Sequence, residues 1–223
     1  MNYTQLSNAI QAYTENTEAD FVANIPVFVT QAEQRIYNSV QFPSIRKNVT
    51  GVTTLNNKYL QCPLDFLAVY SMAVIDAAGS YEYLLNKDVN FIRQAYPVPT
   101  DTGIPRYYAL FGPAVSGSTI SDELSFILGP TPDSTYSVEL HYYYYPESIT
   151  VAADGQTWLG DNFDTVLLYA SLVEAYTYMK GEQDMMQLYN QKFMEALALA
   201  KRLGDGMERQ DAYRSGQFRQ KVT

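Results

Sequence analysis

The sequence is poor in the residues from which metal sites and disulfides are built. It contains one cysteine, one histidine and one tryptophan in 223 residues, namely Cys62, His141 and Trp158. One cysteine permits no disulfide within the chain, and one histidine with one cysteine does not supply the ligands of the usual zinc sites. We therefore expect neither a disulfide framework nor a metal centre.

Motifs that bind phosphates or cofactors are missing as well. Neither the Walker pattern nor the dinucleotide fingerprint occurs, so we expect no cofactor. With a single histidine, no set of nucleophile, base and orienting group is recognisable. The 24 acidic residues leave a glycosidase-like carboxylate pair open, although no pair stands in a recognisable context. We expect Cys62, at the end of a predicted strand, to be a buried and unreactive thiol.

Basic residues are few relative to acidic ones. The chain has 15 Lys and Arg against 24 Asp and Glu, a formal charge of −9, which disfavours binding to duplex DNA.

The first residues of the chain lack the basic start and apolar core of a signal peptide. The longest nearly apolar stretch, Val166–Val173, is far shorter than the ~20 residues that cross a bilayer. We expect a protein kept in a reducing cytoplasm, without membrane contact.

Tyrosine is present in excess. There are twenty tyrosines, and 47% of all residues are hydrophobic, which is enough to bury a core. Tyrosine is large and amphipathic and is enriched at protein interfaces. The composition therefore predicts a soluble protein that assembles with others, without naming an activity.

The N-terminal segment shows the spacing of amphipathic helices. Apolar residues recur every three or four positions at Tyr3, Leu6, Ile10 and Tyr13. Thr17 and Asp20 have the pattern of a capping box, Pro26 suits the first turn of a helix, and Pro43 ends the segment. We expect two helices before residue 43.

The C-terminal segment predicts a buried helix followed by an amphipathic one. Residues 166–173 are apolar on nearly all sides, as in a helix surrounded by protein. Gly181 separates this helix from the next, which we expect to end at the glycine-containing residues 204–206. Glu174 lies in the buried helix, where a lone charge is costly. We expect a buried ion pair between Glu174 and Arg35, with exposure of Glu174 to water as the alternative.

The middle of the chain shows short strand patterns with turn signals between them. We expect hairpins at Asn56-Asn57 and at residues 77–80, a short helix at Asp88–Tyr96 and a tight turn at residues 129–133. These features suggest a small antiparallel sandwich or barrel. The predicted strands are Val49–Leu55, Lys58–Gln61, Leu67–Asp76, Tyr81–Leu85, Tyr107–Phe111, Glu123–Leu128 and Tyr136–Tyr145.

The two helical ends must pack together, because neither can bury its apolar stripe alone. The sequence therefore predicts an α+β fold with a discontinuous helical bundle formed by residues 1–42 and 160–206. An antiparallel β domain, residues 43–159, is inserted between the two halves. Residues 207–223 follow as an extended C-terminal arm.

Two segments are candidates for function. Strand alternation places His141, Tyr143 and Tyr145 on one face, a pattern that fits an active face and is more typical of aromatic packing. The arm combines basic residues with the large apolar residues Met207 and Phe218 among others. Tyr, Phe and Arg carry much of the energy of interfaces, which favours an arm that orders on a partner over a solvating tail.

A series of segments resembles one family in order and spacing over residues 3–200. These segments are Tyr3–Leu6, Phe21–Val29, Ala32–Ile36, Cys62–Phe66, Gly103–Tyr108, Leu128–Pro132, Tyr142–Pro146 and Leu167–Ala170. They resemble the head-to-tail adaptor (connector) proteins of tailed bacteriophages, and are similar to the tail tubular protein A group of short-tailed phages. The residues after Gly206 match this family least well.

The resemblance implies a structural virion protein of the head–tail junction, made in the host cytoplasm, and not an enzyme. Such adaptors form a ring, usually dodecameric, that joins the portal ring to the tail nozzle, with tail fibre proteins as further candidate partners. The ring lines the channel of DNA ejection, through which DNA passes without sequence-specific binding. In the family a C-terminal segment commonly docks on the portal. The corresponding arm residues are Met207, Arg209, Tyr213, Arg214, Phe218, Arg219 and Lys221.

Two further functions stay open. The tyrosine-rich strands could recognise a surface polysaccharide as part of a phage tail, because aromatic faces suit sugar rings. A carboxylate pair could also hydrolyse the cell wall. No residue pattern in the sequence favours either of these over the adaptor role.

Overall fold

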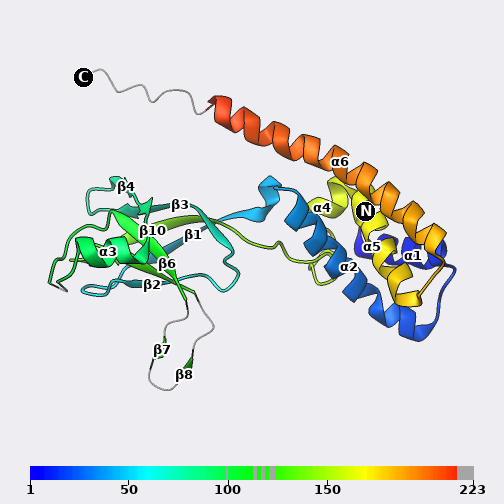
Figure 1. The fold of residues 1–223 in the computed structure, drawn as a ribbon, viewed down its shortest axis with the longest axis horizontal. Helices are drawn as coiled ribbons and strands as arrows, with labels where there is room; N and C mark the ends of the chain where they lie inside the picture. Colours follow the sequence, from blue (N-terminus) through cyan, green and yellow to red (C-terminus); the bar gives the residue numbers. More distant parts are fainter. Residues whose placement is uncertain (99, 113–114, 117–118, 121–123, 215–223) are drawn as a thin grey trace. The chain divides into compact units, whose positions relative to one another are not determined.

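The computed structural model describes residues 1–98, 100–112, 115–116, 119–120 and 124–214. The chain divides into two compact units, which we call the helical unit (Met1–Ile45 with Tyr145–Thr223) and the β unit (Arg46–Tyr144). Along the sequence, helices precede and follow a β region, which confirms the predicted α+β class, and Figure 1 shows the helices from both ends of the chain together in one unit. The chain enters and leaves the β unit on adjacent strands, because Arg46 pairs with Tyr143.

The helical unit is organised around α5 (Asp164–Met179), which packs against α1 (Tyr3–Thr14), α2 (Ala19–Ser39) and α6 (Gln183–Arg214). The remaining helical turns are η1 (Pro43–Ile45) and α4 (Trp158–Asn162). The buried residues of α5 lie on all sides of the helix, which confirms the prediction of a buried helix here. They are Val166, Leu167, Leu168, Ala170, Ser171, Leu172, Val173 and Ala175.

The start of α2 differs from its prediction. The helix begins at Ala19, and Glu18 at its N-cap makes no side-chain hydrogen bond, so the capping box predicted for Thr17 and Asp20 is not formed. Pro26 lies inside the helix and not in its first turn. Its missing N–H removes one backbone hydrogen bond, and buried apolar side chains on both sides of it keep the helix continuous.

The end of α6 differs as well. The helix runs without interruption to Arg214, so the prediction that it ends at residues 204–206 is wrong. A glycine lowers helix propensity by about 1 kcal/mol but keeps its N–H, and most residues from 207 to 212 are good helix formers. Residues 207–214 of the predicted extended arm are therefore helical, whereas residues 215–223 lie outside the described residues.

The β unit is a sandwich of two sheets. Sheet A has the order β1-β10-β3-β4, and sheet B has the order β2-β9-β6-β5, in which only the β5–β6 pair is parallel. A further antiparallel pair is formed by β7 (Val115–Ser116) and β8 (Thr119–Ile120). The strands of sheet A are β1 (Arg46–Val52), β3 (Ala68–Ile75), β4 (Tyr81–Tyr83) and β10 (Ser137–Tyr143). Those of sheet B are β2 (Tyr59–Gln61), β5 (Leu85–Asn86), β6 (Tyr107–Phe111) and β9 (Ser125–Gly129).

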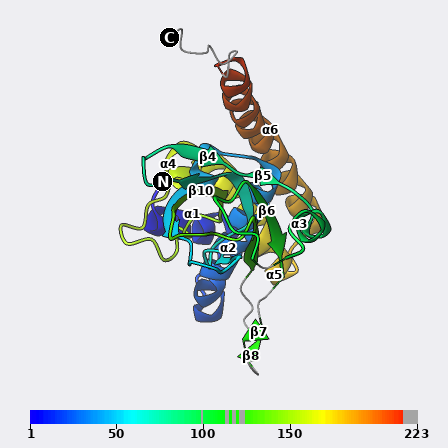
Figure 2. The same cartoon turned by 90° about the vertical axis from the view of Figure 1, so that its left-hand side faces the viewer.

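The core of the β unit lies between the two sheets. Sheet A contributes Met72, Val74, Val138, Leu140 and Tyr142, and sheet B contributes Tyr108, Phe126 and Leu128. The outer face of sheet B is partly covered by α3 (Val89–Ala95), which packs on β6 and β9 (Figure 2). A side chain at Gly129 would place its Cβ 2.9 Å from Ile92 of α3, so glycine permits this close approach.

One of the two predicted hairpins is wrong. The turn at residues 77–80 does join paired strands, because β3 pairs with β4. Asn56 has a positive φ of 60°, as a turn requires, but the strands on either side of it belong to different sheets. β1 pairs with β10 along its whole length, and β2 pairs with β9, so the chain crosses between the sheets at Asn56.

Residues 145–159 belong to the helical unit, whereas the sequence assigned them to the β domain. Ile149 is completely buried, and its N–H donates to Glu33 Oε1 on α2 over 3.0 Å. Glu33 is only 2% exposed. Burial raises the pKa of this carboxyl, and the hydrogen bonds from Ile149 and Ser148 oppose that shift only in part.

Glu33 is predicted to lower stability as the pH rises. Between the ordinary glutamate pKa and the higher pKa in the fold, the folded protein keeps a proton that the unfolded chain has released, so the free energy of unfolding falls across this window. Glu33→Gln keeps the acceptor for Ile149 and removes the titration. Urea unfolding from pH 4 to pH 8 should show the variant gaining stability over the wild type as the pH rises. A constant difference would contradict the assignment.

Candidate functional site

The outer face of sheet A is open to solvent, and strand alternation decides which residues form it. On β10, Val138, Leu140 and Tyr142 point into the core, so the intervening residues point outward. The register extends this face to the neighbouring strands. We call it the sheet A face, and define it by Arg46, Asn48, Thr50, Ser71, Tyr81, Tyr83, Glu139, His141 and Tyr143.

His141 sits among polar cross-strand partners on this face. Its Nδ1 lies 3.1 Å from Ser71 Oγ, and its Nε2 lies 3.4 Å from Glu139 Oε1. Asn48 Nδ2 donates to the same carboxylate oxygen over 3.1 Å. A serine, a histidine and a glutamate meet here, but Ser71 is the directly paired residue of His141 and β10 supplies the other two. Pairing of neighbouring strands on one sheet face is enough to bring these three side chains together.

Tyr145 does not share this face, so that part of the prediction is wrong. β10 ends at Tyr143, and Tyr145 belongs to the helical unit, where its hydroxyl donates to Asn38 Oδ1 on α2. Alternation holds only while the chain stays in the strand. The predicted face therefore loses Tyr145 and keeps His141 and Tyr143.

Aromatic rings and one arginine lie on the sheet A face and at Tyr70, the residue of β3 left unpaired where the register with β10 shifts. The Tyr70 and Tyr143 rings are 6.0 Å apart in an edge-to-face arrangement, and the Arg46 guanidinium lies 4.8 Å from the Tyr70 ring. Tyr81 and Tyr83 stack with 6.3 Å between their rings and are 50% and 67% exposed. Tyrosine and arginine are the residues that anchor protein interfaces. Tyr81 and Tyr83 alternate in the sequence, which places both on one face of a strand, and the prediction from the sequence did not use this signal.

Other tyrosines of the β unit are structural. Tyr142 is 1% exposed and donates its hydroxyl to Asp65 Oδ1 over 2.8 Å, while Lys47 Nζ donates to Oδ2 over 2.8 Å. Burial disfavours the charged form of Asp65, but these two hydrogen bonds outweigh it, and the pKa of the carboxyl lies below its usual value. Asp65 thus ties β1 to β10 beside the core.

Cys62 is buried at the edge of the sandwich core, 4% exposed. Burial raises the pKa of its thiol to about 12, because the thiolate would lose its hydration. At neutral pH the group is a thiol and a poor nucleophile.

The structure brings Arg35 and Glu174 together in the helical unit. Arg35 Nη1 lies 3.5 Å from Glu174 Oε1, and the guanidinium also lies 4.8 Å from the Phe193 ring on α6. The two side chains are 41% and 24% exposed, so the pair lies at the surface of the helices and is not buried. Water screens this ion pair, which links α2, α5 and α6.

The predicted arm residues divide between two regions. Met207, Arg209, Tyr213 and Arg214 lie on the last turns of α6. Phe218, Arg219 and Lys221 lie outside the described residues. In the part of the chain that the structure describes, no three His, Cys, Asp or Glu side chains form a group that could hold a metal ion. Within the same ranges, no helix is both long enough and apolar enough to cross a membrane.

Comparison with known proteins gives one family. A family model described as SU10 adaptor protein matches residues 1–220, which is nearly the whole chain and includes most of the arm. No curated protein matches the sequence.

The two groups of tyrosines should respond differently to substitution. Tyr142→Phe removes a buried hydroxyl that donates to Asp65, and should lower the free energy of unfolding by about 0.5–1.5 kcal/mol. Tyr81→Thr combined with Tyr83→Thr keeps strand propensity and removes exposed rings only, so the change should stay below about 1 kcal/mol. Urea denaturation followed by circular dichroism measures both. A larger loss from the exposed pair would assign Tyr81 and Tyr83 to the core of the fold.

Proposed function

Because the chain belongs to the SU10 adaptor protein family, and is thus a bacteriophage adaptor protein of the virion, we propose that it forms a ring at the head–tail junction. The ring joins the portal protein to the tail nozzle and lines the channel through which DNA leaves. The observation that carries this proposal is the family match over residues 1–220, which covers both units and most of the arm. Its role is structural, without a catalytic step.

The β unit supplies what a ring requires. In a cyclic assembly each copy contacts its two neighbours through different surfaces, so every copy needs two complementary patches. The sheet A face offers exposed Tyr81 and Tyr83 together with Arg46, and the exposed Tyr70 at the register shift beside it contacts Arg46, which is the chemistry of an interface anchor. We assign this face to contacts between copies.

The acidic character of the chain fits a channel for DNA. Protein affinity for duplex DNA comes from Lys and Arg that neutralise phosphates, and this chain has nine more acidic than basic residues. A wall with this charge repels the phosphate backbone and lets DNA slide past. No contact with the bases is needed for that role.

The C-terminal arm is proposed to bind the portal. The stretch 207–223 has four basic and two acidic residues, the opposite sign to the rest of the chain, and carries Met207, Tyr213 and Phe218. Its helical first part continues α6 beyond Ala200, a fully buried residue of that helix. The arm can therefore reach a partner without disturbing the packing around α5.

A glycan-binding tail component is the second candidate function. The observation that favours it is the stacked and exposed pair Tyr81 and Tyr83, because tyrosine rings also pack on sugar rings. Retention of a host polysaccharide by the purified protein, lost with Tyr83→Ala, would support this role. Failure to retain any host polysaccharide would remove it.

Deletion of residues 207–223 should leave the fold intact and abolish portal binding. Among the residues of α6 whose side chains are described, the last buried one is Ala200, before the deleted segment, so the melting temperature should change by no more than a few degrees. Co-sedimentation with purified cognate portal rings measures binding. A truncated protein that still saturates portal rings would contradict the arm assignment.

A pair of charge reversals on one helix provides the control. Arg209→Glu with Arg214→Glu changes two arm residues, and Lys201→Glu with Arg202→Glu makes the same change between one and two turns before the arm. The first variant should lose portal binding and the second should keep it. Equal loss in both would assign the effect to the net charge of the chain and not to the arm.

A further inference from the structure

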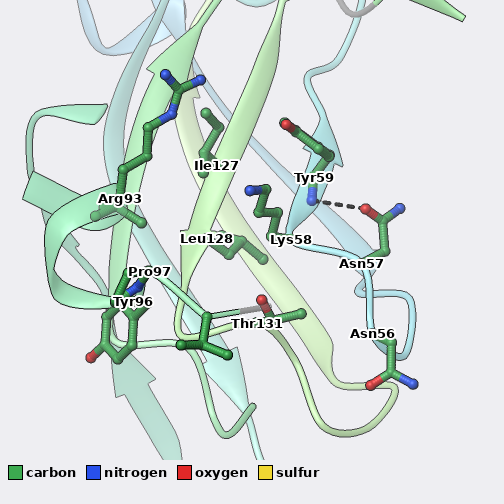
Figure 3. Close-up of a pocket in the computed structure, with 12 residues that line it drawn as sticks. Asn56, Asn57, Lys58, Tyr59, Arg93, Tyr96, Pro97, Ile127, Leu128 and Thr131 are labelled. Carbon is green, nitrogen blue, oxygen red and sulfur yellow. Dashed lines mark hydrogen bonds between the residues drawn. The ribbon is translucent and has the colours of Figure 1, made fainter. Parts of the chain in front are cut away.

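A hollow of about 460 Å³ lies on the outer face of sheet B, beside α3 (Figure 3). β9 forms its floor at Ile127, which packs with Ile92 of α3, whereas the side chain of Leu128 points into the core between the sheets. α3 and the residues after it form one wall, and β2 with the preceding turn forms the other. The size is typical of sites that accept a side chain or a small ligand. The lining residues are Asn56, Asn57, Lys58, Tyr59, Ile92, Arg93, Tyr96, Pro97, Val98, Ile127, Leu128 and Thr131.

The hollow concentrates positive charge in an acidic protein. Lys58 and Arg93 line it from opposite walls, with β9 between them, and no carboxylate is among the described residues that line it. Among the described residues, neither cation has a carboxylate within ion-pair distance, whereas Lys47 and Arg106 of the same unit do, at Asp65 and Glu82. Lys58 and Arg93 are both exposed. Two cations in this setting favour a partner that brings negative charge or aromatic faces.

The remaining lining groups favour the same kind of partner. Asn57 Oδ1 already accepts from the N–H of Tyr59 over 3.0 Å, which leaves its amide N–H groups as donors. Ile127 is 2% exposed and, together with Ile92 of α3, makes the floor apolar. Donors at the walls and apolar groups on the floor suit a phenol ring, whose body is apolar and whose oxygen accepts hydrogen bonds.

The sheet A face of the same chain carries this chemistry. Tyr81 and Tyr83 project from edge strand β4 and are at least half exposed, and Glu139 lies on the same face. Sheets A and B pack through their inner faces, so the hollow and the sheet A face lie on opposite outer surfaces of one sandwich. Complementary patches on opposite sides of one body are what a repeating head-to-tail contact needs.

We propose that the hollow on sheet B of one copy receives Tyr81 and Tyr83 from the sheet A face of the next copy. The two rings rest on Ile127, and Lys58 and Arg93 lie against the rings. This contact rests on the proposed ring function and deepens it, because it names the two surfaces through which copies meet. It also places the cations of an acidic chain at the contact where like-charged copies would otherwise repel one another.

Disulfide trapping between mixed copies tests the contact. One population carries Lys58→Cys and the other carries Tyr83→Cys together with a heavy-isotope label, and they are mixed with portal rings and oxidised mildly at pH 8. The native Cys62 stays silent because it is buried. The matched control replaces Lys58→Cys by Lys87→Cys, an exposed lysine at the other edge of sheet B that does not line the hollow. Mass spectrometry identifies disulfides between labelled and unlabelled chains.

The expected result is a disulfide between copies, joining the thiols introduced at positions 58 and 83, at a yield at least tenfold above the Lys87→Cys control. In support, Lys58→Glu with Arg93→Glu should weaken assembly with the circular dichroism spectrum unchanged. Rings that assemble and give equal yields in both mixtures would overturn this contact and leave the ring function standing. Copies that do not assemble in any mixture would overturn both. If glucuronate protects the residues of the hollow and no disulfide forms, the hollow is a site for acidic sugars and the contact is overturned.

Discussion

The rest of the fold depends on the burial of α5. Its apolar residues point in all directions, so a single neighbouring helix cannot cover them. α1 and α2 cover it from the N-terminal end of the chain and α6 from the C-terminal end. This requirement joins the two termini in one unit and leaves the 99 residues Arg46–Tyr144 to fold as an insertion. The paired strands β1 and β10 then carry the chain into and out of that insertion.

The inserted sandwich separates structural side chains from those available to partners. Tyr142 and Tyr108 are buried in the core, whereas Tyr70, Tyr81 and Tyr83 stay exposed on one outer surface. The opposite surface carries a hollow lined by two exposed cations. One small domain thus presents two outer surfaces of different chemistry. The proposed ring would use both surfaces for contacts between copies and would leave the arm for the portal.

Much of the fold could be predicted from the sequence, because apolar periodicity is a local signal. The spacing of Leu6 and Ile10 and the apolar run 166–173 identified the helices that pack together, and the charge of Glu174 pointed to Arg35 across two helices. Strand pairing is not local, so the turn at Asn56 looked like a hairpin although its strands join different sheets. Glycines at residues 204 and 206 weaken a helix without ending it. The hollow was not predictable, because Lys58 and Arg93 come to line the same hollow only when β2 pairs with β9 and α3 packs on β9.

The most direct test of the adaptor role is an image and a mass of the full-length protein mixed with its cognate portal ring. Negative-stain electron microscopy and native mass measurement together give the position and the number of added copies. The account predicts a single ring-shaped layer at one end of the portal, with the rotational symmetry of that ring. A folded protein that stays monomeric and leaves the portal bare would contradict it.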